Sequence, residues 1–396
     1  MQLSERVRHM SGADAGAWIP YYRAREMIEA GETVTDLTIG DHDISTSSDI
    51  LEQMHRSAMG GKTGYTVIPG IRSLRDAVAE RIQSRTGVPT TYQNVVITSG
   101  GQGALIAAHL ALLDAGDRAV YGEPYYPTYP GTISAAGGTP VALPMRPENG
   151  FRPHADDLDR VAEGTKTILF NSPNNPTGAV YPLSTLKDIA RTAAKHRLWV
   201  ISDEVYDTQL WQGEHISIRS LPDMAERTFV IGSMSKGYAM TGSRVGWLAG
   251  PAARISALEE LLTVVNFGIP EFIQEAALYA LNQGSALERR IAEPYRLRRQ
   301  AALDVLAGRN AVRLLPPDGA MYLMLDIRST GLSGTDFSTR LLDREQIAVM
   351  PGESFGRSAA GHIRIAMTTG ETSLADALDR IAGFAEALAA QKNERD

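Results

Sequence analysis

Short β-branched segments alternate with helical segments between Asn94 and Gly250, and this alternation limits the chain to few folds. The pattern is typical of a parallel sheet covered by helices, because parallel strands are joined by crossover connections that are usually helical. We therefore predict an α/β fold with a mostly parallel sheet. The expected strands are Val95–Ser99, Arg118–Tyr121, Thr167–Asn171, Leu198–Asp203, Thr228–Ser233 and Val245–Ala249.

The C-terminal part shows a mixed pattern that indicates a second, smaller unit. Ala320–Asp326 is expected to be a strand, and an apolar stripe from Leu374 to Leu388 predicts a helix that Ser373 opens, with Asp376 completing its capping box. We expect a large domain over residues 45–285. A small α+β domain is expected from residues 1–44 together with 286–396.

Composition excludes several classes of function. Asp and Glu outnumber Lys and Arg by 46 to 39, for a net charge of −7, so no partnership with nucleic acid is expected. The most apolar stretch, Gly103–Leu113, is too short to span a membrane. The absence of cysteine excludes disulfides, thiolate metal sites and a cysteine nucleophile, and it fits the cytoplasm, where we expect the protein.

Glycines follow the first expected strand, at the point where ligands bind in α/β sheets. Gly100, Gly101 and Gln102 open a helix there and offer backbone N–H groups to a phosphate, although the same residues also suit a simple tight turn. Neither the P-loop pattern nor the full dinucleotide fingerprint is present.

Three further strand ends carry polar residues. Asn174-Asn175-Pro176-Thr177-Gly178 follows the third strand and could simply be a turn. Asp203 ends a buried strand, so its charge needs a cationic partner unless it only caps a helix. Lys236 follows the fifth strand among small residues and is suited to act as an amine nucleophile, although most lysines lie on the surface.

Together, in this order, these motifs resemble the class I/II aminotransferases of the fold type I pyridoxal-phosphate enzymes. The resemblance covers nearly the whole chain from about Leu37. It implies a large domain with a mostly parallel sheet and a smaller α+β domain. The motifs that carry it are Ser-x-Ser-Lys-x-x-x-x-x-Gly-x-Arg-x-Gly at 233–246, Asn-Asn-Pro-Thr-Gly at 174–178, Asp-Glu-x-Tyr at 203–206, Pro-Gly-x-x-Phe-Gly at 351–356, and Arg364.

The resemblance implies that the cofactor is pyridoxal 5′-phosphate. Lys236 would form the internal aldimine and shuttle the proton between Cα and C4′, while Asp203 would pair with the protonated pyridine nitrogen. Tyr206 and Asn175 would hydrogen-bond the ring 3′-oxygen. Tyr126 would stack on the ring, with its neighbour Tyr125 as the alternative assignment. The phosphate would lie against the backbone of Gly100, Gly101 and Gln102, with Ser233 and Arg244 completing its site.

The resemblance also names substrate contacts. Arg364 would hold the α-carboxylate bidentately, helped by Asn175 and the backbone of Gly40. Trp18 either lines the side-chain pocket or packs the N-terminal segment onto the core. Tyr65 would reach the cofactor phosphate of a partner subunit, which implies a homodimer.

One residue departs from the family pattern. His42 stands where many relatives have proline, and this alters the loop over the substrate. Asp41, His42 and Asp43 are poorly placed to bind a metal because adjacent side chains diverge, so no metal site is predicted. No second arginine for a dicarboxylate side chain is identified.

The implied reaction is transamination by ping-pong half-reactions. An L-amino acid donates its amino group and a 2-oxo acid, expected to be 2-oxoglutarate, accepts it. A carbon–sulfur β-lyase is the alternative on the same fold, because fold and cofactor site do not fix the reaction. A serine hydrolase of the penicillin-binding type would also use Ser233 and Lys236, but Lys62-Thr63-Gly64 precedes the serine motif instead of following it.

Overall fold

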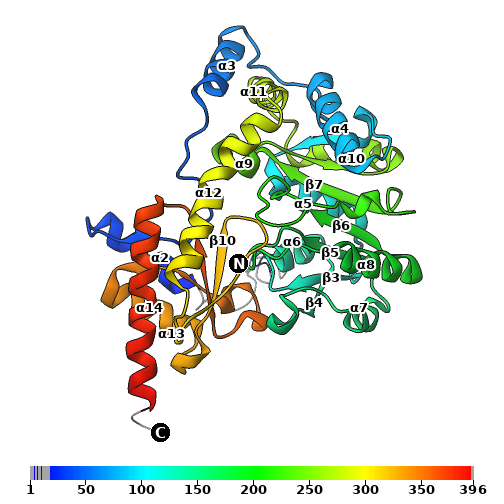
Figure 1. Ribbon diagram of the computed structural model, residues 1–396. Coiled ribbons are helices and arrows are strands. Elements are labelled where there is room, and N and C mark those ends of the chain that lie inside the picture. The colour runs from blue at the N-terminus through cyan, green and yellow to red at the C-terminus, as the bar shows by residue number, and fades with distance from the viewer. Residues whose placement is uncertain (1–3, 5–6, 8–9, 11–17, 394–396) are drawn as a thin grey trace.

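The largest sheet has seven strands, and those labelled in Figure 1 lie in the right half of the view. A computed structural model describes residues 4, 7, 10 and 18–393. In this sheet β8 is antiparallel to both neighbours and all other pairs are parallel, so the predicted mostly parallel α/β sheet is confirmed. In spatial order the strands are β2 (Val95–Thr98), β8 (Gly246–Ala249), β7 (Thr228–Ser233), β6 (Trp199–Asp203), β5 (Thr167–Asn171), β3 (Arg118–Glu123) and β4 (Thr139–Pro144).

The strands are apolar along their length because helices cover both faces of the sheet. Val96 and Leu248 pack on one face, whereas their neighbours Val95 and Trp247 pack on the other. The helices outside the C-terminal part are α3 (Ser48–Met59), α4 (Arg72–Thr86), α5 (Gly100–Leu112), α6 (Tyr129–Ala135), α7 (Ala155–Ala162), α8 (Leu183–His196), α9 (Met234–Gly237), α10 (Ala252–Val265) and α11 (Glu271–Asn282).

Strand β4 was not predicted from the sequence. Pro140 and Pro144 lie within it, and proline normally argues against a strand. It pairs only with β3, at the edge of the sheet, where a missing N–H costs no ladder hydrogen bond. The six expected strands are all present, with ends shifted by a residue or two.

A four-stranded antiparallel sheet lies beside the large one. Its order is β12 (Met350–Pro351), β13 (His362–Ala366), β10 (Tyr322–Asp326) and β9 (Arg313–Leu315). A separate pair joins β1 (Thr35–Asp36) to β11 (Ile347–Ala348), which brings the N-terminal segment to the C-terminal part. The remaining helices are α2 (Ile19–Glu29), α12 (Ser285–Val305), α13 (Gly334–Glu345) and α14 (Glu371–Asn393).

The start predicted for the last helix is wrong. The backbone N–H of Leu374 bonds to the carbonyl of Gly370, so α14 begins at Glu371 and Ser373 lies inside its first turn. Leu374, Leu378 and Ile381 are buried against the small sheet, as the apolar stripe predicts.

Helix α12 connects the two sheet regions. It passes from beside α9 to beside α14 (Figure 1). The boundary expected between residues 285 and 286 falls at its first turn, and the domain limits stay a prediction. None of the described helices is long and apolar enough to cross a membrane.

Candidate active site

A cavity of about 1250 Å³ lies at the carboxyl ends of β5, β6 and β7. Side chains from the small sheet and from the loop at residues 39–41 close its other side. This position is where parallel α/β sheets bind ligands. Lys236, Asp203, Asn175 and Arg364 all line the cavity, so the structure brings together residues that are far apart in the sequence.

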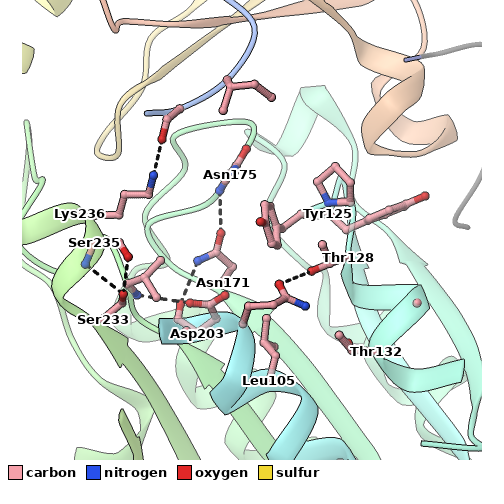
Figure 2. Close-up of a pocket in the computed structure, with 18 of the residues that line it drawn as sticks. Leu105, Tyr125, Thr128, Thr132, Asn171, Asn175, Asp203, Ser233, Ser235 and Lys236 are labelled. Carbon is pink, nitrogen blue, oxygen red and sulfur yellow. Dashed lines mark hydrogen bonds between the residues drawn. The ribbon is translucent and has the colours of Figure 1, made fainter. Parts of the chain in front are cut away.

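Lys236 enters the cavity from α9, directly after β7. The side chain of Ser233 caps this short helix by accepting from the backbone N–H of Ser235 at 3.1 Å. Lys236 Nζ donates to the carbonyl oxygen of Gly40, a contact visible in Figure 2. The amine therefore points across the cavity toward the loop over the opposite wall.

Asp203 lies at the end of β6 and is fully buried. Its Oδ2 accepts from the Tyr129 hydroxyl at 2.6 Å and its Oδ1 from the backbone N–H of Val205 at 3.3 Å. Burial raises the pKa of this carboxyl from 3.8 to about 6, and no described cation counteracts that effect. The cationic partner that we expect for Asp203 from the sequence is therefore not one of the described side chains.

Asn171 and Asn175 connect Asp203 to Arg364. The Asn171 side chain donates to the Asp203 carbonyl at 2.9 Å and accepts from the Asn175 backbone N–H at 2.7 Å (Figure 2). The Asn175 side-chain oxygen accepts from Arg364 Nη1 at 3.0 Å. Its amide N–H₂ therefore remains available to donate to a ligand.

Arg364 presents a buried cation with no described carboxylate partner. It is only 4% exposed, and its other donated bond goes to the carbonyl of Thr38. Its guanidinium carbon lies 4.5 Å from the ring centroids of both Tyr322 and Phe355. The Nε atom has no hydrogen-bond partner in the described structure. A buried guanidinium of this kind needs an anion, and a carboxylate matches its donor geometry.

Strand register explains how Arg364 reaches the cavity. It pairs with Met324 on β10 and with Met350 on β12, so Tyr322, two residues from Met324, shares its face. Tyr322 in turn contacts Tyr206, with the two hydroxyl oxygens 2.9 Å apart. The small sheet thus supplies the wall opposite the ends of β5 and β6.

Both tyrosines considered for ring stacking line the cavity. Tyr126 interacts electrostatically with Asp203 and Arg364, and burial raises its pKa. Tyr125 packs edge-on against Tyr121, with ring centroids 5.0 Å apart. Tyr126 packs edge-on against Tyr129, the partner of Asp203, with ring centroids 5.8 Å apart, so it lies beside the buried carboxylate of the site.

The glycines after β2 form a close-fitting cradle. Gly100 has φ +68°, which favours glycine, and a Cβ there would lie 2.8 Å from Arg244 Nη2. The Ser99 side chain leaves the first N–H groups of α5 uncapped. Arg244 donates to the Thr241 carbonyl at 2.8 Å and is exposed on the cavity wall. Helix N–H groups beside a guanidinium suit an anion.

Two more predicted phosphate contacts surround this cradle. Ser233 donates to the Ser235 hydroxyl at 3.0 Å, and both line the cavity. The Gln102 side chain accepts from the Thr128 hydroxyl at 3.0 Å. The backbone N–H of Gln102 lies in the first turn of α5. The assignment of Ser233 and Gln102 to a phosphate site stays a prediction.

Gly40 and Trp18 lie on the loop and N-terminal side of the cavity. A Cβ at Gly40 would overlap the Tyr322 hydroxyl, so the close approach of this loop requires glycine. Trp18 is half-buried and also packs against the core with Tyr21, at 5.9 Å between ring centroids. The two interpretations of Trp18 are therefore both compatible with its position.

Tyr65 does not line the cavity of its own chain. It is 89% exposed and contacts Phe267 edge-on at 5.0 Å. Other exposed apolar side chains belong to the same two segments, 59–67 and 264–267. They are Met59, Val67, Val264 and Val265.

Sequence reasoning missed Tyr129 and Tyr322. Both have hydroxyl groups that contact predicted site residues, Asp203 and Tyr206 respectively. Tyr129 opens α6, a short helix that was not predicted, and Tyr322 comes from the other sheet. The sequence could place Tyr322 on the expected strand Ala320–Asp326, but the pairing of that strand with the one that carries Arg364 became visible only in the structure.

Comparison with known proteins agrees with this site. The family model for aminotransferase class I and II matches residues 32–381. The chain is 42% identical to the arginine–pyruvate transaminase of Pseudomonas aeruginosa over 392 residues, covering 99% of this chain and 100% of that protein. It is 35% identical to the aspartate/prephenate aminotransferase of Thermus thermophilus over 386 residues, covering 96% and 98%.

A solved structure gives the same result. The Thermus thermophilus aspartate aminotransferase with maleate superposes with a TM-score of 0.90 at 34% identity, over 97% of this chain and 100% of that one. The resemblance and fold predicted from the motifs are therefore confirmed, as is the prediction of an aminotransferase. This chain belongs to the class I and II aminotransferase family.

Proposed function

We propose that this aminotransferase uses pyridoxal 5′-phosphate held on Lys236, and that it exchanges an amino group between an L-amino acid and a 2-oxo acid. One observation carries the proposal: a buried carboxylate without a cation and a buried guanidinium without an anion line the same cavity as Lys236. A protonated pyridine ring and a substrate carboxylate are the two missing partners. Bound there, the cofactor supplies an aldehyde for the amino group and a ring that withdraws electrons from the substrate Cα.

Each polar group of the site then has a separate role. Asp203 accepts the N–H of the pyridinium ring, and Tyr129 holds that carboxylate in place. The Tyr206 hydroxyl and the free N–H₂ of Asn175 donate to the ring oxygen. Lys236 Nζ would accept the proton released from the substrate Cα and donate it to the cofactor C4′ within the same half-reaction, and it would move a proton from C4′ back to Cα in the second half. Tyr126 covers the face of the ring.

The phosphate site is proposed at the start of α5. The backbone N–H groups of Gly100, Gly101 and Gln102 point to that position, and Arg244 adds a charge. The Ser233 and Ser235 hydroxyls complete the donor set. Anchoring the phosphate at one end and the ring nitrogen at the other fixes the orientation of the cofactor.

Arg364 is proposed to bind the α-carboxylate of both substrates. Asn175 orients the guanidinium through Nη1, and the Thr38 carbonyl accepts its other bond. Gly40 and Trp18 line the same cavity, and the substrate side chain would lie against Trp18.

A homodimer is proposed from the surface around Tyr65. Exposed apolar side chains in the segments 59–67 and 264–267 suit burial against a second copy. Tyr65 on this surface would then contribute its hydroxyl to the partner subunit's phosphate site. A cytoplasmic location rests on the cysteine-free composition alone.

The charges that line the cavity bear on the choice of donor and acceptor. Among the described cavity-lining residues, the basic side chains are Lys236, Arg244 and Arg364, and each has a proposed role. The expected acceptor 2-oxoglutarate has a second carboxylate, which would require a cation from the partner subunit. Pyruvate has no such requirement, and the name of the Pseudomonas aeruginosa relative specifies pyruvate together with arginine. The relatives compared above are named transaminases or aminotransferases, so the β-lyase alternative gains no support.

The test is the visible absorption spectrum of the purified protein with a panel of amino acids, without any oxo acid. We expect bound cofactor to give a visible band that a good donor bleaches, and the panel ranks arginine against aspartate and aromatic donors. Adding pyruvate or 2-oxoglutarate should then restore the band, and the faster of the two is the acceptor. A protein that pyridoxal phosphate cannot colour would overturn the cofactor proposal. Oxo acid and ammonia formed without bleaching would favour the lyase.

A further inference from the structure

His42 bridges two parts of the molecule through both of its ring nitrogens. Nε2 lies 2.9 Å from the carbonyl oxygen of Lys236, and Nδ1 lies 2.8 Å from the Tyr295 hydroxyl. The rings of His42 and Tyr295 meet edge-on, with centroids 5.4 Å apart. The mechanism proposed above gives this side chain no role.

Hydrogen-bond chemistry fixes the direction of the bridge. A carbonyl oxygen can only accept, so Nε2 carries the proton and donates to Lys236. Burial and the charge of Lys236 lower the pKa of His42 to about 4, so the ring is neutral at physiological pH and Nδ1 must accept from the Tyr295 hydroxyl. The other charged groups around the ring are Asp41, Asp43 and Arg298.

Helix α9 needs this contact because it is only four residues long. A helix this short leaves its last carbonyl groups without helical partners. The His42 ring satisfies the carbonyl of Lys236 within the helix, and the Thr46 hydroxyl donates at 2.5 Å to the carbonyl of Ala239, two residues past the helix end. The loop at residues 40–46 therefore caps the turn that carries the lysine.

The same loop is anchored to α12 on its other side. The Asp43 carboxylate binds Arg298 through two hydrogen bonds of 2.8 and 2.5 Å, and Arg298 also donates to the Met367 carbonyl at 2.8 Å. Tyr295 lies on the same helix. Lys236 is thus tied through His42 to the helix that joins the two sheet regions.

We propose that His42 is a positioning residue for Lys236. By holding the Lys236 carbonyl against α12, it fixes the backbone from which the long lysine side chain reaches the cofactor carbon. The inference rests on the proposed function, since it requires Lys236 to hold the cofactor. A proline at position 42 could not donate this hydrogen bond.

The test measures the visible band of the cofactor-loaded protein without substrate as a function of pH. Its midpoint reports the environment of the Lys236 nitrogen and is independent of turnover. We expect His42→Ala to shift the midpoint by about 0.5 pH unit or more, the size that the loss of one hydrogen bond implies. We also expect kcat to fall about tenfold with KM little changed, as loss of positioning predicts.

Three further variants separate positioning from loop stability. His42→Gln retains a donor at the place of Nε2 and should restore most of the wild-type midpoint. Tyr295→Phe removes only the phenol hydroxyl, and its effect should disappear when His42 is already alanine. Asp43→Asn weakens the attachment of the loop to α12 without touching Lys236, so it should lower thermal stability and leave the midpoint unchanged.

Each outcome supports or overturns the positioning role of His42. A folded His42→Ala protein with an unchanged midpoint would overturn the inference, as would an equal shift in Asp43→Asn. If His42→Ala does not fold, a His42→Gln midpoint that matches wild type together with a shifted Tyr295→Phe midpoint supports it, and no shift in either refutes it. Borohydride reduction followed by mass spectrometry tests separately whether Lys236 holds the cofactor, as the proposed function requires. If the wild-type cofactor is not trapped on Lys236, the proposed function fails.

Discussion

The buried carboxylate of Asp203 should make the protein less stable before it binds its cofactor. Its pKa of about 6 in the folded chain, against an ordinary value of 3.8, means that the folded state holds a proton which the unfolded chain has already lost. The folded state therefore binds more protons between about pH 4 and pH 6. The stability contributed by the protonated group is full below about pH 4 and is lost as pH rises through 6.

The magnitude follows from the same two values. A rise from 3.8 to about 6 corresponds to about 3 kcal/mol at neutral pH, at about 1.36 kcal/mol for each pKa unit. Asn has the same shape and no charge, so Asp203→Asn should stabilise the cofactor-free protein. By linkage, the difference from wild type should grow from about 1 kcal/mol at pH 4.5 to about 3 kcal/mol at pH 7.5.

Urea unfolding of cofactor-free wild type and Asp203→Asn at several pH values measures this difference. Protein concentration must be held constant because assembly contributes to the apparent stability of a dimer. Burial also raises the pKa of the adjacent Glu204 in both proteins, and the charge of Glu204 is one of the causes that raise the pKa of Asp203. Parallel stability curves for the two proteins across this pH range would refute the reasoning.

The same substitution should weaken the binding of the cofactor. Truncating one partner of a buried charge pair typically costs about 2–5 kcal/mol, so the cofactor Kd should rise about 30-fold or more. Fluorescence titration of the cofactor-free proteins measures it. An unchanged Kd for Asp203→Asn would mean that the carboxylate does not bind the pyridine nitrogen.

Four other substitutions test the site. Lys236→Ala should abolish turnover and keep the unfolding midpoint near that of wild type, and multiple turnover at the wild-type rate would disprove the assignment. Arg364→Ala should raise KM for amino acid and oxo acid alike, by about 30-fold or more, in steady-state assays; unchanged values for both would remove Arg364 from the site. Gly40→Ala should lower the free energy of unfolding by about 1–3 kcal/mol because its Cβ overlaps the Tyr322 hydroxyl, and Tyr322→Phe should recover part of that loss; a Gly40→Ala protein as stable as wild type would contradict the overlap.

The sheet and the strand ends could be predicted because they leave strong local patterns. Buried parallel strands are apolar runs. Asp203, at the end of one strand, and Lys236, shortly after another, are polar side chains at positions where burying a polar group costs free energy unless the group has a partner. The edge strand β4 escaped prediction because its prolines are tolerated only at an edge, and a local pattern does not reveal which strand is outermost.

Contacts between distant segments could not be predicted. Tyr322 meets Tyr206 across 116 residues of sequence, and Tyr295 meets His42 across 253. No periodicity encodes such pairs, because they depend on how the two sheets face each other. His42 itself was recognised only as a departure from the family pattern, and its partners became visible with the fold.

The buried guanidinium of Arg364 at the cavity has a kinetic consequence. If Arg364 binds the α-carboxylate of both substrates, as proposed, donor and acceptor must occupy the same place and can never be bound to one site together. An acceptor that enters before the donor blocks the site unproductively, and high acceptor concentrations should therefore slow the enzyme. Small carboxylates such as acetate should compete with both substrates, which makes the choice of assay buffer part of any measurement of this enzyme.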